Sequence, residues 1–258
     1  MKNLKHFAFL LGAFIIVSSC ESDDQEETPV PLTPFTEVKG SGDIAGKLAE
    51  FRTLLGNPVN ATPGQTAGRR EITWDGVPAA QTNTNTFPCD FFNSKDTAVA
   101  AGRKRGAEFT TPGTGFRTSD NDFEDLLTGY GEQFNAFSPA RTFAPVGSNK
   151  TDVLFKVPGT SNGASVNGFG VVFSDVDRAN STSIEFFEGD KSLGIFTAPV
   201  RTDASGISFL GVFFPENKVT RATITSGDIA VSNKFADGGQ YDVVVMDDFL
   251  YNEPKAAN

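Results

Sequence analysis

From Arg69 onward, the chain consists of short runs of residues that favour β-strands, separated by clusters of Gly, Pro, Asn and Asp. Alternation with a period of two is typical of β-strands that bury one face. The pattern predicts ten strands, near residues 70–74, 106–110, 115–118, 152–157, 166–174, 182–188, 192–197, 206–214, 219–225 and 241–251. Between two of these runs, the sequence Glu188-Gly189-Asp190-Lys191 is typical of a hairpin turn.

Residues 42–55 have apolar positions at helical spacing. Ser41 can cap the start of this helix, and Gly56 can end it. We expect the helix to pack on the flank of a β domain or to close one of its open ends. Ten strands and one helix predict an all-β fold, a jelly-roll-type antiparallel β-sandwich with one short N-terminal helix, in a single domain over residues 41–258.

The last predicted strand ends in two carboxylates. Residues 243–246 are all apolar, which suits a strand buried on both faces, and Asp247 and Asp248 follow directly. Alternation sends neighbouring side chains to opposite faces, so at least one of these carboxylates is expected to point into the core. A buried carboxylate needs an arginine, backbone donors or a cation.

The N-terminus has the pattern of a secretion signal. Residues 1–19 combine two lysines with an apolar stretch, and Val17-Ser18-Ser19-Cys20 ends that stretch with small residues. This pattern resembles the lipobox of bacterial lipoproteins, and the resemblance implies cleavage before Cys20 and acylation of that cysteine. The apolar stretch, residues 7–17, is too short to span a bilayer.

Residues 20–40 are predicted to be a disordered tether. They contain a dense acidic cluster over residues 21–27, followed by a run rich in Pro and Thr over residues 28–34. An acidic cluster directly after a lipidated cysteine resembles the surface-export signal of lipoproteins in the Bacteroidetes group. That resemblance implies a lipid-anchored, outward-facing location at the outer membrane. The alternative is a plain solvated tether.

Composition argues against several classes of function. The formal net charge is −10, and it becomes −12 without residues 1–19, which contain two lysines and no acid. Such acidity disfavours nucleic acid as a partner. The only histidine, His6, lies in the predicted signal peptide, so the mature chain lacks a Ser-His-Asp triad and His-ligated metal sites. With Cys20 acylated, Cys89 has no disulfide partner, and its phenylalanine neighbours predict that it is buried.

Four aspartates are candidate metal ligands. Asp175 and Asp177 end a predicted strand and lie on the same face of it. Together with Asp247 and Asp248 they offer oxygen ligands at the edge of the sandwich, which predicts a structural Ca²⁺ site. The alternative is that ion pairs neutralise these carboxylates, with Arg117, Arg178 or Arg221 as partners.

Three further residues are candidates for ligand binding. Trp74 is the only tryptophan, and an exposed Trp next to Asp75 can stack on a sugar ring while the carboxylate accepts its hydroxyl groups. Tyr130 is a second aromatic residue of this kind. The alternative for Trp74 is a half-buried side chain that anchors its loop.

Four segments carry a resemblance to known proteins. Residues 68–78, 111–116, 168–177 and 245–249 are similar to an uncharacterised secreted bacterial β-sandwich family, and the similarity extends over about residues 42–253. It implies a fold and brings no activity. The last strand alone resembles that of jelly rolls of the galactose-binding-like and carbohydrate-binding-module type, in which a carboxylate at this place often ligates a structural calcium.

These features favour a surface-displayed outer-membrane lipoprotein that acts as a non-catalytic binding module for a glycan or an extracellular polymer. Two alternatives stay open. One is a glycoside-active enzyme, because glycosidases need only a carboxylate pair and the chain offers many acids. The other is a structural or adhesive envelope protein that has a protein partner.

Overall fold

The computed structural model describes residues 33–238 and 240–257. The chain divides into two compact units, Met1–Leu32 and Thr33–Asn258, and the description below concerns the second. The predicted signal peptide, Cys20 and the acidic cluster lie outside the described residues. Within the described part, no helix is long and apolar enough to cross a membrane.

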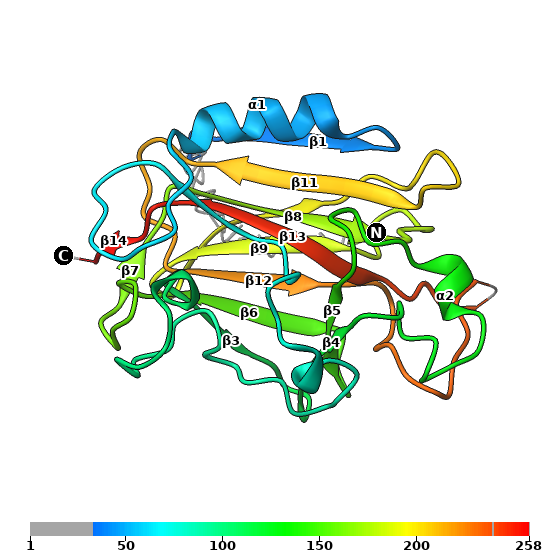
Figure 1. The fold of residues 1–258 in the computed structure, drawn as a ribbon. Helices are drawn as coiled ribbons and strands as arrows, with labels where there is room; N and C mark the ends of the chain where they lie inside the picture. The colour runs from blue at the N-terminus through cyan, green and yellow to red at the C-terminus, as the bar shows by residue number, and fades with distance from the viewer. Residues whose placement is uncertain (1–32, 239, 258) are drawn as a thin grey trace, which may run out of the picture. The chain divides into compact units, whose positions relative to one another are not determined.

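The second unit is built from two large antiparallel sheets (Figure 1). The first sheet contains β1 (Thr36–Ser41), β11 (Ile207–Phe213), β8 (Gly168–Ser174), β13 (Val245–Asn252), β5 (Thr142–Val146) and β4 (Gly115–Ser119) in that order, and β2 (Arg69–Ile72) also pairs with β13. The second sheet contains β10 (Lys191–Thr197), β9 (Ser183–Glu188), β12 (Arg221–Thr225), β6 (Lys150–Phe155) and β3 (Ala107–Thr110). A small third sheet pairs β14 (Lys255–Ala256) with β7 (Ala164–Ser165).

Residues 33–238 and 240–257 contain few helical segments. They are α1 (Ala45–Leu55), α2 (Tyr130–Gln133) and two short 3₁₀ turns, Ala79–Gln81 and Ala101–Arg103.

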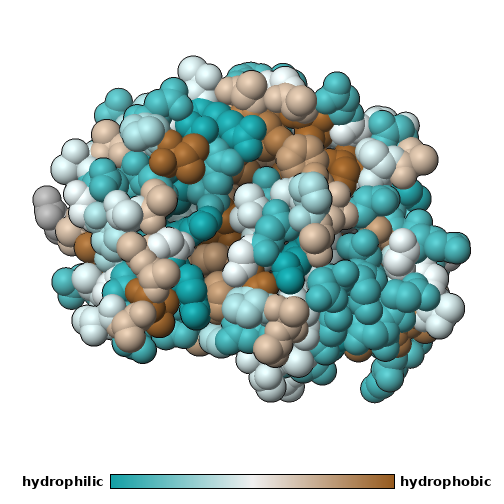
Figure 2. All heavy atoms as spheres, in the orientation of Figure 1, coloured by the Kyte–Doolittle hydropathy of each residue, from teal (hydrophilic) through white to brown (hydrophobic). Residues whose placement is uncertain are grey.

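The predicted all-β antiparallel sandwich is confirmed. The chain crosses repeatedly from one large sheet to the other, for example from β8 to β9 and from β10 through β11 and β12 to β13, as in jelly-roll folds. The main core is rich in phenylalanine, and Phe109 from the second sheet meets Phe249 from the first in an edge-to-face contact. On the face seen in Figure 2, apolar residues are interspersed with hydrophilic ones, as expected of a solvent-facing surface.

Helix α1 covers part of the outer face of the first sheet, where it contacts β1, β11 and β13 (Figure 1). Its buried residues Leu48, Phe51 and Leu55 form a second core with that face. The prediction of a helix packed on the flank is therefore correct, although the helix begins at Ala45. Ser41 does not cap it, because Ser41 ends β1; Asp43 Oδ1 instead accepts a hydrogen bond from the Ala45 N–H at 3.0 Å.

Two strands of the large sheets, β1 and β5, were missed in the sequence, as were the two-residue strands β7 and β14. The predicted tether is wrong for residues 36–40, because β1 pairs with β11 over its whole length. β1 is polar except for the buried Val38, so it has little of the hydrophobic signal of a strand. β5 contains Pro145, a residue that counts against a strand interior, yet β5 pairs with β4 along its length.

Candidate metal centre

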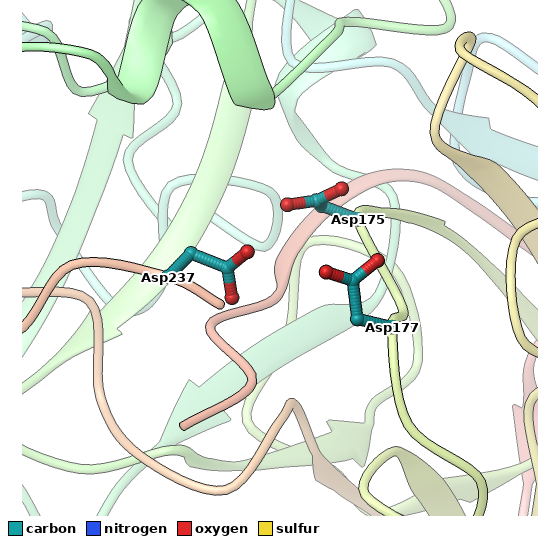
Figure 3. A group of neighbouring side chains, drawn as sticks. All are labelled: Asp175, Asp177 and Asp237. Atoms are coloured by element: carbon teal, nitrogen blue, oxygen red, sulfur yellow. The ribbon is translucent and has the colours of Figure 1, made fainter. Parts of the chain in front are cut away.

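Three aspartates converge where β8 ends. Asp175 directly follows Ser174, the last residue of β8, and its positive φ of 74° turns the chain out of the sheet. Asp177 lies two residues further on, and Asp237 comes from the long connection between β12 and β13. One carboxylate oxygen from each of the three lies within 4.8 Å of the others, and Figure 3 shows the carboxylates facing one another.

Asp175 is the buried member of this triad, with 1% of its surface exposed. Within the described residues, no donor forms a hydrogen bond with its Oδ2 atom, and its Oδ1 atom lies 3.1 Å from Arg201 Nη1. Burial, with the neighbouring Asp237 and Asp177 as further causes, raises the pKa of Asp175 to about 8 against the opposing effect of Arg201. A buried carboxylate without enough partners is costly, and a bound cation would supply the missing interaction.

Arg201 is the main cationic neighbour of the triad. It comes from the connection between β10 and β11 and forms ion pairs with both Asp175 and Asp177. The predicted partners were Arg117, Arg178 and Arg221, and their ion pairs lie elsewhere, with Asp125, Asp228 and Asp152 respectively. The predicted pairings are wrong for Arg117 and Arg221, because the arginine that reaches this corner of the fold comes from the connection between β10 and β11.

Asp242 was missed in the sequence, and it holds the backbone of the segment that carries Asp177. Its carboxylate is fully buried and accepts hydrogen bonds from the backbone N–H groups of Asp177 and Arg178 at 3.1 and 3.2 Å. It also accepts one from the Ser181 hydroxyl. Burial raises the pKa of Asp242, while these hydrogen bonds act in the opposite direction. Asp242 thus holds in place the segment that carries Asp177.

The triad has the composition of a site for a hard cation. Its donors are carboxylate oxygens, and three carboxylates against one arginine leave a negative charge in a partly buried place. One contact within the protein already orients Asp237, because its Oδ1 atom accepts a hydrogen bond from the Val243 N–H at 2.6 Å. This buried acidic triad can hold a metal ion.

Asp247 and Asp248 were predicted to point to opposite faces of their strand, and this is wrong. The pairing between β13 and β8 shifts between Met246 and Phe249, so a β-bulge interrupts the alternation at these two residues. Both carboxylates therefore lie on the same side, where the Ser138 hydroxyl is 3.0 Å from Asp247 Oδ1 and 2.8 Å from Asp248 Oδ1. They form a pair of their own, apart from the triad of Asp175, Asp177 and Asp237.

Backbone donors and a shared proton satisfy this second pair. Asp247 accepts hydrogen bonds from the backbone N–H groups of Phe137, at 2.5 Å, and Ser138, at 3.2 Å. Burial, with the adjacent Asp248 charge as the second cause, raises the pKa of Asp247 to about 9, and burial also raises the pKa of Asp248. The Ser138 hydroxyl has a single proton, so it can donate to only one of the two carboxylates at a time. A proton held by the carboxyl pair supplies the hydrogen bond that is then missing.

The candidate residues for sugar stacking lie in the interior. Trp74 is 1% exposed; its ring stacks on Phe143 at 3.8 Å, and its Nε1–H donates to the backbone oxygen of Asp247 at 2.7 Å. Tyr130 is equally buried, and its hydroxyl donates to backbone oxygens of the β12–β13 connection. Neither ring is available to a sugar, so this prediction is wrong for both. Asp75 is half-buried, and burial raises its pKa.

Cys89 is exposed, so the prediction of a buried thiol is also wrong. The neighbouring phenylalanines, Phe87, Phe91 and Phe92, occupy the core positions instead. A single small apolar residue between larger ones carries no signal that decides its direction.

Comparison of the chain with protein-family models, with curated proteins and with solved structures finds no match. Function therefore has to follow from the chemistry of the residues described above.

Proposed function

We propose that this chain is a non-catalytic binding module for a glycan or an extracellular polymer, held at the outer membrane by lipid on Cys20 and displayed outward. A structural Ca²⁺ at Asp175, Asp177 and Asp237 orders the loops at the end of its sandwich. The observation that carries the cation site is the buried Asp175 Oδ2 atom, which has no donor within the described residues and faces two more carboxylates.

Calcium suits the triad better than other common metals. The ligand atoms are carboxylate oxygens, which hard cations prefer, whereas zinc sites usually include His or Cys. The triad joins two irregular segments, and Ca²⁺ tolerates irregular geometry better than Mg²⁺. Water and backbone oxygens would complete its six to eight ligands.

The role of a binding module is supported over that of a glycosidase by the state of the second acidic pair. Asp247 and Asp248 are 0% and 2% exposed, and their oxygens are engaged by Ser138 and by backbone N–H groups. A glycosidase needs two carboxyl groups that flank the bond in a site open to substrate.

Calcium binding is tested by calorimetry and thermal unfolding of the chain carrying Cys20→Ser, with CaCl₂, MgCl₂ or chelator. At a hundredfold excess of Ca²⁺ over its Kd we expect about 2.7 kcal/mol of added stability. Asp237→Asn should weaken Ca²⁺ binding at least tenfold, yet its amide oxygen can keep the hydrogen bond from Val243. The exposed Asp190, in the turn between β9 and β10, supplies the control Asp190→Asn. Unfolding curves that do not respond to Ca²⁺ would rule out the site.

Polymer binding is tested separately, on immobilised xylan, laminarin, mannan and pectin, with Ca²⁺ and with chelator. Retention that is lost in chelator supports a Ca²⁺-ordered binding module. Calcium binding without retention on any polysaccharide would reject the glycan role and favour an adhesive protein with a protein partner.

A further inference from the structure

A cavity of about 270 Å³ lies beside the β12–β13 connection. It is lined by both polar and aliphatic side chains, among them Asn85, Arg117, Leu126, Val231, Ser232 and Asn233. These residues come from four separate segments, so the fold itself assembles the cavity. Its volume is just below the usual range for drug-sized ligands and suits one small ring.

Arg117 is the chemically distinctive residue of this cavity. It lies on β4 and is 4% exposed, and its Nη1 donates to Asn85 Oδ1 at 2.9 Å. Its Nη2 forms an ion pair with Asp125, while its Nε–H has no acceptor within the described residues. The guanidinium charge is thus already balanced, and the Nε–H, which is closed off from solvent, is a buried donor without a partner among the described residues.

We propose that this cavity binds one neutral sugar ring, at the end or branch of a glycan. Hydroxyl groups of a sugar can both donate and accept, which matches the mixture of Arg117, Asn85, Ser232 and Asn233. The aliphatic Leu126 suits the C–H face of the ring. Because Asp125 already neutralises Arg117, a neutral sugar fits this place better than an acidic one.

The cavity and the metal centre share one loop. Ser232 and Asn233 form part of the cavity wall, and Asp237 reaches the triad a few residues later. The same loop is held by Tyr130, whose hydroxyl donates to the backbone oxygens of Ser232 at 3.1 Å and Phe235 at 2.6 Å. A cation at Asp237 therefore orders a wall of the sugar site, so this inference rests on the proposed function and adds to it the place and class of the ligand.

The probes are the methyl glycosides of glucose, galactose, mannose and xylose, with methyl glucuronoside as the acidic comparison. In ¹H–¹⁵N spectra of the Ca²⁺-loaded chain carrying Cys20→Ser, we expect at least one neutral glycoside to shift the Arg117 Nε–H signal and the side-chain amides of Asn85 and Asn233. Tighter binding of methyl glucuronoside than of every neutral glycoside would overturn the assignment of a neutral ring.

Two variants in the same exposed loop separate this site from the metal centre. Asn233→Trp places a bulky ring at the cavity and should weaken sugar binding at least tenfold, with Ca²⁺ affinity unchanged. Lys234→Trp, at the next exposed position, should bind sugar as the unsubstituted chain does. Unchanged polysaccharide retention by Asn233→Trp would overturn this inference and leave the proposed function standing. Failure of the Ca²⁺-loaded chain to bind any sugar or polysaccharide would reject both.

Discussion

Arg70 and Glu253 form an ion pair that is closed off from solvent, with side chains 0% and 1% exposed. The guanidinium donates from Nε and Nη2 to the two carboxylate oxygens at 2.6 and 2.7 Å. Asn60 adds a hydrogen bond to Glu253 at 2.8 Å. Such a pair adds little net stability over an apolar substitute, but removal of one partner leaves a buried charge uncompensated.

We therefore expect Glu253→Gln to lower the free energy of unfolding by about 3 kcal/mol, measured by urea denaturation. The control is Glu37→Gln, because Glu37 pairs with Lys39 at the surface at 2.9 Å, and its loss should change stability by less than about 0.5 kcal/mol. Equal effects of the two substitutions would mean that Arg70 finds other partners.

Asp247 makes the stability of the fold depend on pH. Its pKa rises from an ordinary value of 3.8 to about 9 on folding, mainly through burial and secondly through Asp248. Between these values the folded state holds a proton that the unfolded chain has released, so the contribution is full below about pH 4 and is lost as pH rises through about 9. The slope for one proton is at most about 1.4 kcal/mol per pH unit.

Asp247→Asn should flatten this dependence. The amide does not titrate; its oxygen can accept from Phe137, and its N–H can replace the shared proton toward Asp248. From pH 5 to pH 9, the unsubstituted chain should therefore lose unfolding free energy relative to Asp247→Asn. Denaturation of both proteins at each pH measures this difference. Glu71 and Arg52 also act on Asp248 and are the same in both proteins. Parallel curves would show that Asp247 is ionised throughout.

Among the elements, helix α1 packs closely on the first sheet because two paired strand residues beneath it are glycines. Gly170 and Gly211 lie opposite each other in the β8–β11 pairing, and the Phe51 ring lies above them. A Cβ atom on Gly211 would lie 2.8 Å from two atoms of that ring, and one on Gly170 would lie 2.8 Å from a third. The glycines thus let the helix approach closely, at the expense of strand propensity.

Gly211→Ala should lower the unfolding free energy by about 1–3 kcal/mol through overpacking. The penalty should fall by roughly 1 kcal/mol in a Phe51→Leu background, because leucine lacks the ring atoms in question. Denaturation of the four proteins of this double-mutant cycle measures the coupling. Gly46→Ala, on α1 with open space around its Cβ, is the control and should be additive with Phe51→Leu. Full additivity of Gly211→Ala would contradict the close contact.

Elements with a clear hydrophobic pattern could be predicted from the sequence, and those shaped by tertiary context could not. β8 and β11 are apolar runs bounded by turn residues, and both lie where the pattern placed them. β1 is an edge strand with a single buried residue, Val38, and only its pairing with β11 makes it a strand. The β-bulge at Asp247 could not be predicted from the sequence either, because it arises where the partner strand of β13 changes from β5 to β2.

In the molecule as a whole, two of the three carboxylates of the candidate metal centre could be predicted from the sequence. Asp175 and Asp177 are close because they are two residues apart, and spacing alone predicted that they act together. Asp237 joins them through a contact between segments about sixty residues apart, and Arg201 comes from a third segment, the connection between β10 and β11. No local pattern encodes such contacts, since they follow from the way the two sheets bring their loops to one end.

The proposed lipid anchor is the remaining whole-molecule property, and the proposal places it on Cys20. Several acyl chains contribute about 0.8 kcal/mol per buried methylene, which suffices for stable membrane attachment, whereas one chain does not. We therefore expect Cys20→Ala to move the protein from the membrane fraction to the soluble fraction. Cys89→Ala is a matched control because Cys89 is an exposed thiol in the β-sandwich unit. This substitution should leave the protein at the membrane. Protease added to intact cells should reach the membrane-attached protein. If Cys20→Ala still sediments with membranes, the attachment is made by the β-sandwich itself, and a sugar polymer bound at the envelope becomes the first candidate for what holds it there.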